Sequence, residues 1–182
     1  MEPLEPEGRQ PSAPDIRTEI GQTRPFGSRG EELVVSILRT ADEAHRFIVG
    51  VLAEEDLTDQ QYNVLRILRG AGPGGLPTLA IGERMIERTP GVTRLIDRLL
   101  RKDFVERERD TEDRRRIVCR ITDEGLAVLD RIQPRLDASV GRMEGALPDD
   151  VLSELGGALD MVRQALRTAT PRPESDAASG SD

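Results

Sequence analysis

The chain has 182 residues, with 26 basic against 34 acidic side chains and a formal net charge of −8. This length suits one ordinary domain, or one domain with an extension. The single cysteine, Cys119, excludes an intrachain disulfide, and no stretch approaches the length of apolar residues that a membrane span requires. The first residues do not resemble a signal peptide, so we expect a cytoplasmic protein.

The acidic charge is unevenly distributed along the chain. Residues 76–120 carry 12 basic against 9 acidic side chains, whereas the remainder carries 14 against 25. The acidic excess therefore lies outside the basic segment, where it would repel DNA from the other faces of the molecule. The net charge does not exclude a nucleic-acid partner.

Both ends of the chain are poor in large apolar side chains. Residues 1–28 and 171–182 are rich in small, polar and proline residues. Such segments bury too little apolar surface to offset the entropy lost on ordering, so we expect disordered tails around one domain at 29–170. The whole chain has one tyrosine, three phenylalanines and no tryptophan, which favours a core of aliphatic side chains between helices.

Two amphipathic helices begin the predicted domain. Over residues 31–52 the apolar side chains recur with the helical period, and they are Val34, Ile37, Leu38, Ala41, Ala44, Ile48 and Val51. A second helix is predicted after Thr58, because Gln61 follows three positions later and completes the pattern of a capping box. It continues to about Arg69, and the glycine-rich run 70–75 ends it.

A short turn joins the next two predicted helices. Pro77 fits the first turn of a helix that continues to about Ile86. The next helix is predicted to begin with Thr89 as its N-cap and Pro90 at its first position, and to end at Lys102.

Two strands are predicted after this helix. Asp103 occupies the position of a left-handed residue at a helix end, a conformation that aspartate tolerates. The strands cover 104–109 and 116–121. In the second strand every other residue is predicted to face inward, namely Ile117, Cys119 and Ile121, and these alternate with Val118 and Arg120.

Two long helices are predicted to complete the domain. Thr122 caps the first, whose apolar stripe continues to Leu147, and Pro134 implies a kink or a break in it. The second helix, over 149–166, has apolar residues at alternating spacings of three and four, namely Leu152, Leu155, Leu159, Val162 and Leu166. This seam indicates a partner helix.

The helices predicted over 77–86 and 89–102 form a helix-turn-helix. In this motif the first turns of the second helix normally meet the base edges of DNA. The candidate DNA-binding residues in those turns are Thr89, Gly91, Thr93 and Arg94, and Arg98 is a further candidate towards the C-terminal end of the helix. Taken singly, each is equally well interpreted as a surface residue of an amphipathic helix. Together, and followed by an arginine-rich hairpin, they favour DNA binding.

Three consecutive arginines lie at the tip of the predicted hairpin, Arg114 and Arg115 between the two strands and Arg116 at the start of the second. A charge run of this kind is usually only solvated. Here Asp113 is close enough to hold one arginine in a bidentate pair, which leaves another to enter a narrow minor groove. We assign the outward role to Arg114 and the held role to Arg115.

These features resemble the MarR family, bacterial winged helix-turn-helix regulators of transcription. The motifs that carry the resemblance are LTDQQYNVL (57–65), VTRLIDRL (92–99), the wing residues Asp110, Asp113, Arg114 and Arg115, and RITDEG (120–125). The chain departs from the family pattern at Ile81-Gly82, where Leu-Ala is common, and at Asp103-Phe104, where Gly-Leu is usual. Neither departure breaks the fold.

The resemblance implies a mainly α fold with a small β-hairpin wing. It places a DNA-binding lobe at about 57–121 and dimerisation helices at about 30–53 and 123–168. It also implies a homodimer on a pseudo-palindromic operator, more often a repressor than an activator, from which small molecules or oxidants release the DNA.

A small-molecule effector would bind, on the family pattern, between the dimerisation helices and the DNA-binding lobe. By position, the candidates to line such a pocket are His45, Phe47, Tyr62 and Arg66. His45 has the alternative interpretation of a packed or solvated side chain. Cys119 is interpreted as a small apolar residue of a strand, since the peroxide-sensing branch of the family carries its cysteine near the first helix. We expect no cofactor and no metal site.

Two other classes of function fit the sequence less well than a regulator. A protein-interaction module would use the same fold with the C-terminal helices as its surface, but the arginine wing would then be superfluous. An enzyme is disfavoured, because the chain has no glycine-rich phosphate loop, no nucleophile motif and no histidine base.

Overall fold

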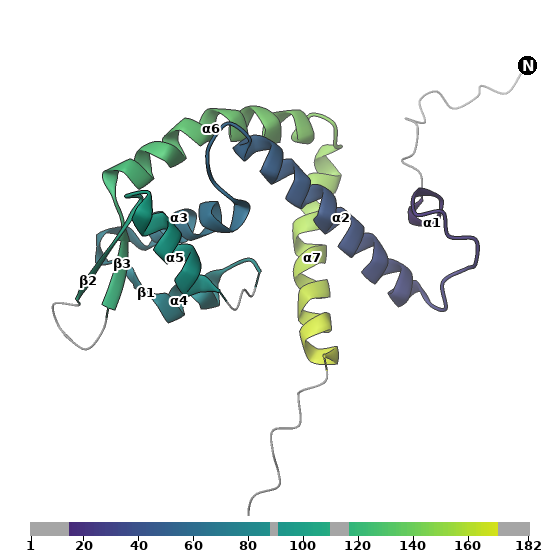
Figure 1. Ribbon diagram of the computed structural model, residues 1–182. Helices are drawn as coiled ribbons and strands as arrows, with labels where there is room; N and C mark the ends of the chain where they lie inside the picture. The colour runs from purple at the N-terminus through teal and green to yellow at the C-terminus, as the bar shows by residue number, and fades with distance from the viewer. Residues whose placement is uncertain (1–14, 88–90, 110–116, 171–182) are drawn as a thin grey trace, which may run out of the picture. The chain divides into compact units, whose positions relative to one another are not determined.

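The computed structural model describes residues 15–87, 91–109 and 117–170. The described residues fall into two compact units, which divide after Asp130. The elements of the first unit are α1 (Ile16–Glu19), α2 (Arg29–Leu52), α3 (Asp59–Ala71), the 3-10 turn η1 (Gly72–Gly74), β1 (Leu76–Pro77), α4 (Thr78–Arg84), α5 (Val92–Arg101), β2 (Val105–Arg109) and β3 (Ile117–Ile121) (Figure 1). Helix α6 (Asp123–Glu144) extends from the first unit into the second, which also contains α7 (Asp149–Ala169). The predicted class, mainly helical with a small sheet, is confirmed.

The starts of α2 and α3 follow from local side-chain caps. Ser28 accepts a hydrogen bond from the backbone N–H of Glu31, and α2 begins directly after it. At α3 the predicted capping box is confirmed, because Thr58 Oγ1 accepts from the Gln61 N–H and the Gln61 side chain accepts from the Thr58 N–H. Each bond satisfies a backbone donor that the helix itself leaves without a partner.

Both helices of the helix-turn-helix are shorter than predicted. Helix α4 ends at Arg84, because Met85 turns into extended backbone and buries its side chain. The N-cap residue of α5 is Gly91, so the prediction of a helix beginning at Pro90 is wrong. Glycine is accepted at an N-cap, since that position is not helical. Thr89 and Pro90 themselves lie outside the described residues.

Helix α5 ends at Arg101, one residue before the predicted end, and the turn after it is as predicted. Asp103 has a φ of 56°, the left-handed conformation expected from its position. The reversed chain lets the Phe104 N–H donate to the Leu99 carbonyl at 3.0 Å, which satisfies a carbonyl at the end of the helix. Strand β2 begins at the next residue.

The sheet has three antiparallel strands in the order β1-β3-β2, one more than the two predicted. The added strand, β1, pairs Leu76 with Cys119 and Pro77 with Val118. Gly75 makes this pairing possible, because its φ is +65° and a Cβ there would lie 2.5 Å from the carbonyl oxygen of Cys119. A two-residue strand has too little pattern to be recognised from the sequence alone.

Strand β3 does not have the predicted alternation of faces. Cys119 is buried and Ile121 is half-buried, but Ile117 is exposed and Val118 is buried. The prediction of one inward face is therefore wrong at Ile117 and Val118. Val118 lies where β3 is the central strand, between Pro77 of β1 and Glu108 of β2. Ile117 lies beyond β1, at the exposed end of the hairpin.

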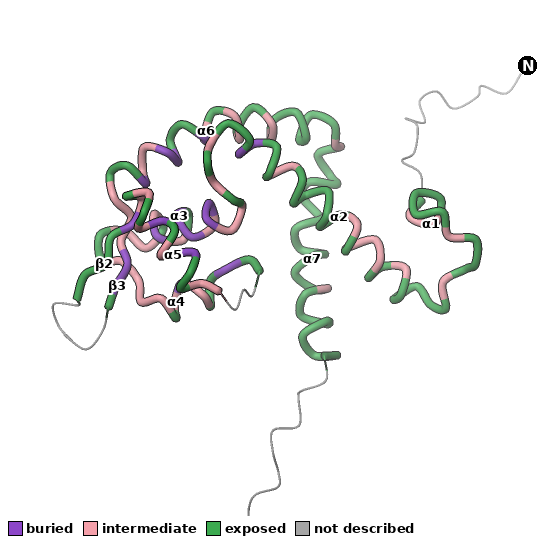
Figure 2. Tube along the Cα trace, in the orientation of Figure 1, coloured by how far each residue is buried: buried purple, intermediate pink, exposed green. Residues whose placement is uncertain are grey.

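The core of the first unit surrounds α3, which contacts α2, α4, α5 and β3. Figure 2 shows buried residues along α3, α5 and β3. The side chains of this core are almost all aliphatic, as the composition predicts. The fully buried ones are Val64, Leu65, Leu68, Ile81, Ile96, Leu99, Cys119, Val128 and Leu129.

The structure differs from the predicted N-terminal tail over residues 15–28. Helix α1 forms there, and the Asp15 side chain caps it by accepting from the Thr18 N–H at 2.8 Å. This hydrogen bond lowers the pKa of Asp15. Residues 1–14 and 171–182, the rest of the predicted tails, lie outside the described residues.

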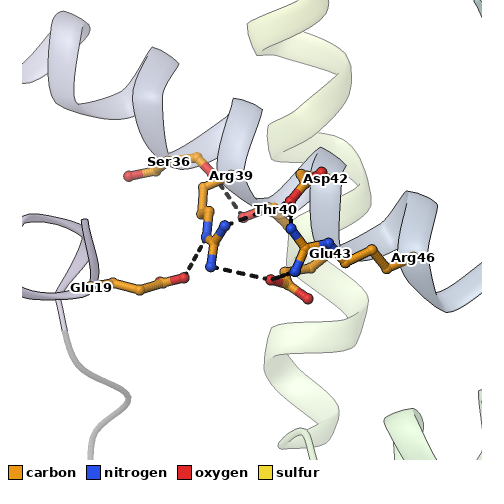
Figure 3. Close-up of polar contacts among 7 residues, drawn as sticks. All are labelled: Glu19, Ser36, Arg39, Thr40, Asp42, Glu43 and Arg46. Carbon is orange, nitrogen blue, oxygen red and sulfur yellow. Dashed lines mark hydrogen bonds and ion pairs between the residues drawn. The ribbon is translucent and has the colours of Figure 1, made fainter.

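An arginine on α2 holds α1 in place. Arg39 Nε lies 2.6 Å from the Glu19 carboxylate, and its Nη2 lies 3.4 Å from Glu43 (Figure 3). The hydrogen bond that Arg39 donates to the Glu19 carboxylate raises the pKa of Arg39. On the other side, Arg46 pairs with Asp42 at 2.8 Å. The ion pair of Arg39 with Glu19 therefore joins α1 to α2.

Helix α6 begins at the predicted cap, since Thr122 Oγ1 accepts from the Gly125 N–H at 3.1 Å. It is continuous through Pro134, so the predicted break is absent and proline is accommodated within the helix. Helix α7 has no buried residue among its apolar side chains or elsewhere. Among the residues that the structure describes, no helix is both long and apolar enough to cross a membrane.

Candidate nucleic-acid interface

Helix α5 has a buried face and a basic face. Leu95, Ile96 and Leu99 point into the core and are at most 6% exposed. The exposed side chains of the helix are Thr93, Arg94, Arg98 and Arg101. The three arginines follow at spacings of four and three, so they line one side of the helix. Arg101 belongs to this face as fully as the predicted Arg94 and Arg98 do.

The N-terminal end of α5 packs closely against α4. A Cβ on Gly82 would lie 3.3 Å from Val92 Cγ2, so glycine lets the two helices approach at this point. Gly91, a predicted DNA-binding residue, is half-buried and forms the N-cap of α5. Of the predicted residues on this helix and its approach, Thr93, Arg94 and Arg98 are exposed, and Thr89 lies outside the described residues.

The turn after α4 is held by α3. The backbone N–H of Ile86 donates to Asn63 Oδ1 at 3.0 Å, and Gln60 donates to Glu87 at 3.4 Å. Asn63 and Gln60 therefore fix the approach to α5 from a helix that does not itself present the basic face. Neither was a candidate from the sequence, because only the fold brings residues 60–63 next to 86–87.

The C-terminal end of α5 is tied to the loop before α3. Lys102, the only lysine of the chain, donates from Nζ to the Asp56 backbone carbonyl and lies 2.7 Å from its carboxylate. Its side chain is therefore directed away from the arginine face and towards Asp56. The basic side chains of the helix itself, Arg94, Arg98 and Arg101, form no such contact with another described residue.

The hairpin of β2 and β3 carries the segment that contains the wing arginines. Arg114, Arg115 and Arg116 lie outside the described residues. The strands on either side are held by ion pairs, between Arg107 and Asp97 of α5 at 2.8 Å, and between Arg120 and Glu108. The sequence did not indicate these pairs.

Of the four candidate effector residues, Tyr62 and Arg66 contact each other, His45 contacts Asp59, and Phe47 is half-buried without a polar contact of its ring. Arg66 donates to Tyr62 Oη at 2.8 Å and lies over the tyrosine ring, with 5.6 Å from its carbon to the ring centroid. His45 Nδ1 lies 3.4 Å from the Asp59 carboxylate, across from α2 to the start of α3. Phe47 is half-buried on α2. Cys119 is fully buried, 3.8 Å from Thr78 Oγ1.

Known proteins share this arrangement. A family model described as the MarR family matches residues 57–117. A crystal structure of a MarR transcription factor from Planctomyces limnophilus is 34% identical, covers 75% of this chain and 99% of that chain, and has a TM-score of 0.55. The PcaV transcriptional regulator from Streptomyces coelicolor, solved in complex with its natural ligand, is 28% identical, with coverages of 81% and 99% and a TM-score of 0.60.

A curated relative matches over a shorter stretch. The HTH-type transcriptional regulator YkoM of Bacillus subtilis is 34% identical over 98 residues, which is 53% of this chain. The match spans 62% of YkoM, less than two thirds of that protein.

Proposed function

The chain belongs to the MarR family, and from this premise we propose that it is a sequence-specific DNA-binding regulator of transcription. The observation that carries the proposal is the exposed face of α5, on which Arg94, Arg98 and Arg101 stand over a buried apolar base. A rigid helix with one basic face is what insertion into a major groove requires. The similar proteins named above are transcriptional regulators.

The first turns of α5 would read the bases. Thr93 and Arg94 lie nearest its N-terminal end, and an arginine there is able to donate two hydrogen bonds to the acceptors of a guanine. Arg98 and Arg101 lie further along and would meet phosphates. Thr89 would also lie near the base edges, and Gly91 would let the protein backbone approach the DNA closely. From the wing, Arg114 would enter the adjacent minor groove, whereas Arg115 would be held by Asp113.

A homodimer would bring two such helices to one operator. The apolar stripe of α7 is exposed in the single chain, and a second copy of the same helix region is the partner we propose for it. In this assignment, 57–121 forms the DNA-binding lobe, and 30–53 and 123–168 the dimerisation helices. Two-fold symmetry then requires a pseudo-palindromic operator with half-sites about one helical turn apart.

The regulator would act as a repressor in the cytoplasm, by occupying promoter DNA until a small molecule releases it. PcaV, which shares the fold, was solved with its natural ligand. In this chain His45, Phe47, Tyr62 and Arg66 are the residues we propose for an effector. Asp59 and Tyr62 lie on α3, which also holds the turn before α5 through Asn63, so a ligand that shifts α3 would shift the reading helix.

A protein-interaction module is not favoured, because binding another protein would not require the exposed arginine face of α5. We propose no catalytic activity, as the family consists of regulators.

The test is the binding of the purified protein to the DNA upstream of its own gene. Fluorescence anisotropy measures this binding over a series of salt concentrations. Preference for that duplex over a scrambled one, with log K falling steeply as log salt rises, is the expected result. Equal affinity for both duplexes, repeated with duplexes enriched from genomic DNA, would refute sequence-specific binding.

A further inference from the structure

The two strands of the hairpin differ in their apolar support. In β3, Val118 and Cys119 are buried, whereas in β2 only Val105 is buried and the four residues that follow are exposed. Since β2 is an edge strand, its outer side has no neighbouring strand. Figure 1 shows the hairpin extending from its base beside α5. Core packing therefore holds β3, and along β2 polar contacts add to it.

One polar contact joins the hairpin to α5. Arg107, at the middle of β2, places Nη1 2.8 Å from the Asp97 carboxylate. Asp97 follows Thr93 by four residues, so it lies on the helix beside the basic face. Both side chains are partly exposed, at 31% for Arg107 and 42% for Asp97.

A second contact holds the hairpin through Arg120 of β3. Its Nε donates to the Pro73 carbonyl of η1 at 2.7 Å, and its Nη1 pairs with the Glu108 carboxylate. Gly75 permits this contact, because a Cβ there would lie 2.7 Å from Arg120 Cγ. Glu108 follows Arg107 directly, and successive side chains of a strand point to opposite faces. The two contacts therefore hold the two faces of the hairpin.

We propose that the Arg107–Asp97 ion pair and the contacts of Arg120 fix the angle between the wing and α5, and that Asp97 and Arg120 are positioning residues for operator recognition. The inference rests on the proposed function. A helix and a wing that read neighbouring grooves of one duplex must keep a defined separation. The ion pair joins β2 to α5, and the hydrogen bond of Arg120 to the Pro73 carbonyl joins β3 to η1. Asp97 thus has a role that its charge alone would oppose, since a carboxylate beside the basic face repels phosphate.

The charge and the positioning role of Asp97 predict opposite results for Asp97→Asn. Removing a negative charge near DNA raises the affinity for every duplex. Loss of positioning lowers the affinity for the operator, by about twofold to fivefold for an exposed ion pair, with a smaller change for a scrambled duplex. We expect the second result, measured by fluorescence anisotropy at fixed salt.

Matched variants separate positioning from general charge effects. Glu83→Gln removes the same charge from an exposed residue of α4, and should leave the operator preference unchanged. The reversed pair, Asp97→Arg with Arg107→Asp, keeps the net charge and should recover part of the preference that either single change loses. Arg120→Lys keeps the charge but not the two-pronged contact, and should also reduce the preference.

The outcomes are distinct. Operator binding by Asp97→Asn that is as tight as wild type, with the same preference, overturns the positioning role while the proposed function stands. Equal loss in Glu83→Gln would also overturn it. Urea unfolding of each variant verifies that the protein remains folded. A wild-type protein without operator preference overturns the proposed function and this inference together.

Discussion

Helices α5 and α7 have similar sequence patterns and opposite environments. Each has leucines at helical spacing with charged residues between them. In α5, Leu99 is fully buried, whereas in α7 Leu155 is 47% exposed. The large apolar side chains that α7 leaves exposed are Val151, Leu152, Leu155, Leu159, Met161 and Leu166.

An apolar stripe on a helix therefore predicts that this face is buried, but it does not predict which surface covers it. Fully burying a leucine contributes about 1.5–3 kcal/mol, so a stripe of this length is costly to leave in water. For α5 the partner is α3 of the same chain. For α7 we propose the second copy of the homodimer, and the following substitutions test the contrast.

The largest effect is expected from a charge placed in the stripe of α7. Leu155→Asp would bury an unpaired carboxylate in the dimer interface, at a cost of about 3–5 kcal/mol. The dimer dissociation constant should rise at least about a hundredfold. Analytical ultracentrifugation measures it, with Glu154→Gln on the neighbouring position as control. An unaltered dimer would exclude this stripe from the interface.

A smaller effect is expected in α5, where the partner lies within the chain. Leu99→Ala removes a fully buried side chain and should lower the free energy of unfolding by about 2–5 kcal/mol. Urea unfolding at one protein concentration measures this loss. The variant should remain dimeric while it is folded, since Leu99 belongs to the core of the first unit. Dissociation without a loss of stability would contradict that assignment.

The smallest effects are expected from two glycines, one in a closely packed position and one in an open position of α7. A Cβ on Gly125 in α6 would lie 2.2 Å from the carbonyl oxygen of Phe104, whereas one on Gly157 in α7 meets nothing within 4 Å. Gly125→Ala should therefore destabilise the protein by about 1–3 kcal/mol. Gly157→Ala should stabilise it by about 0.5–1 kcal/mol, because alanine favours the helix. Urea midpoints of the two variants should move in opposite directions, and a shift of both to lower urea would mean that a partner surface approaches Gly157.

Features set by neighbouring residues were predictable from the sequence. The capping box of Thr58 and Gln61 depends on a spacing of three, and the left-handed Asp103 on its position after the helix. The helical periods of α2, α6 and α7 are likewise local. The motifs at 57–65, 92–99 and 120–125 were sufficient to indicate the MarR family, which the comparisons confirm.

Features that join distant residues were not predictable. The N-cap of α5 shifted to Gly91, and β1 formed at Leu76–Pro77, where Pro77 was predicted to lie in the first turn of a helix. The contacts of Asn63 with Ile86 and of Lys102 with Asp56 cross 23 and 46 positions of sequence. The helical period of the sequence does not predict such pairs, because each pair depends on how the helices pack against one another.

The sequence by itself determined the class of fold, the family and the basic helix, because helical period, caps and charge are properties of short segments. The tertiary structure decided which of those charges are presented. It directed Lys102 to Asp56 and paired Asp97 with Arg107, while it left Arg94, Arg98 and Arg101 exposed. The physical reason is that an ion pair requires two side chains within a few ångströms, and only packing of the core brings α5 beside β2 and the loop before α3.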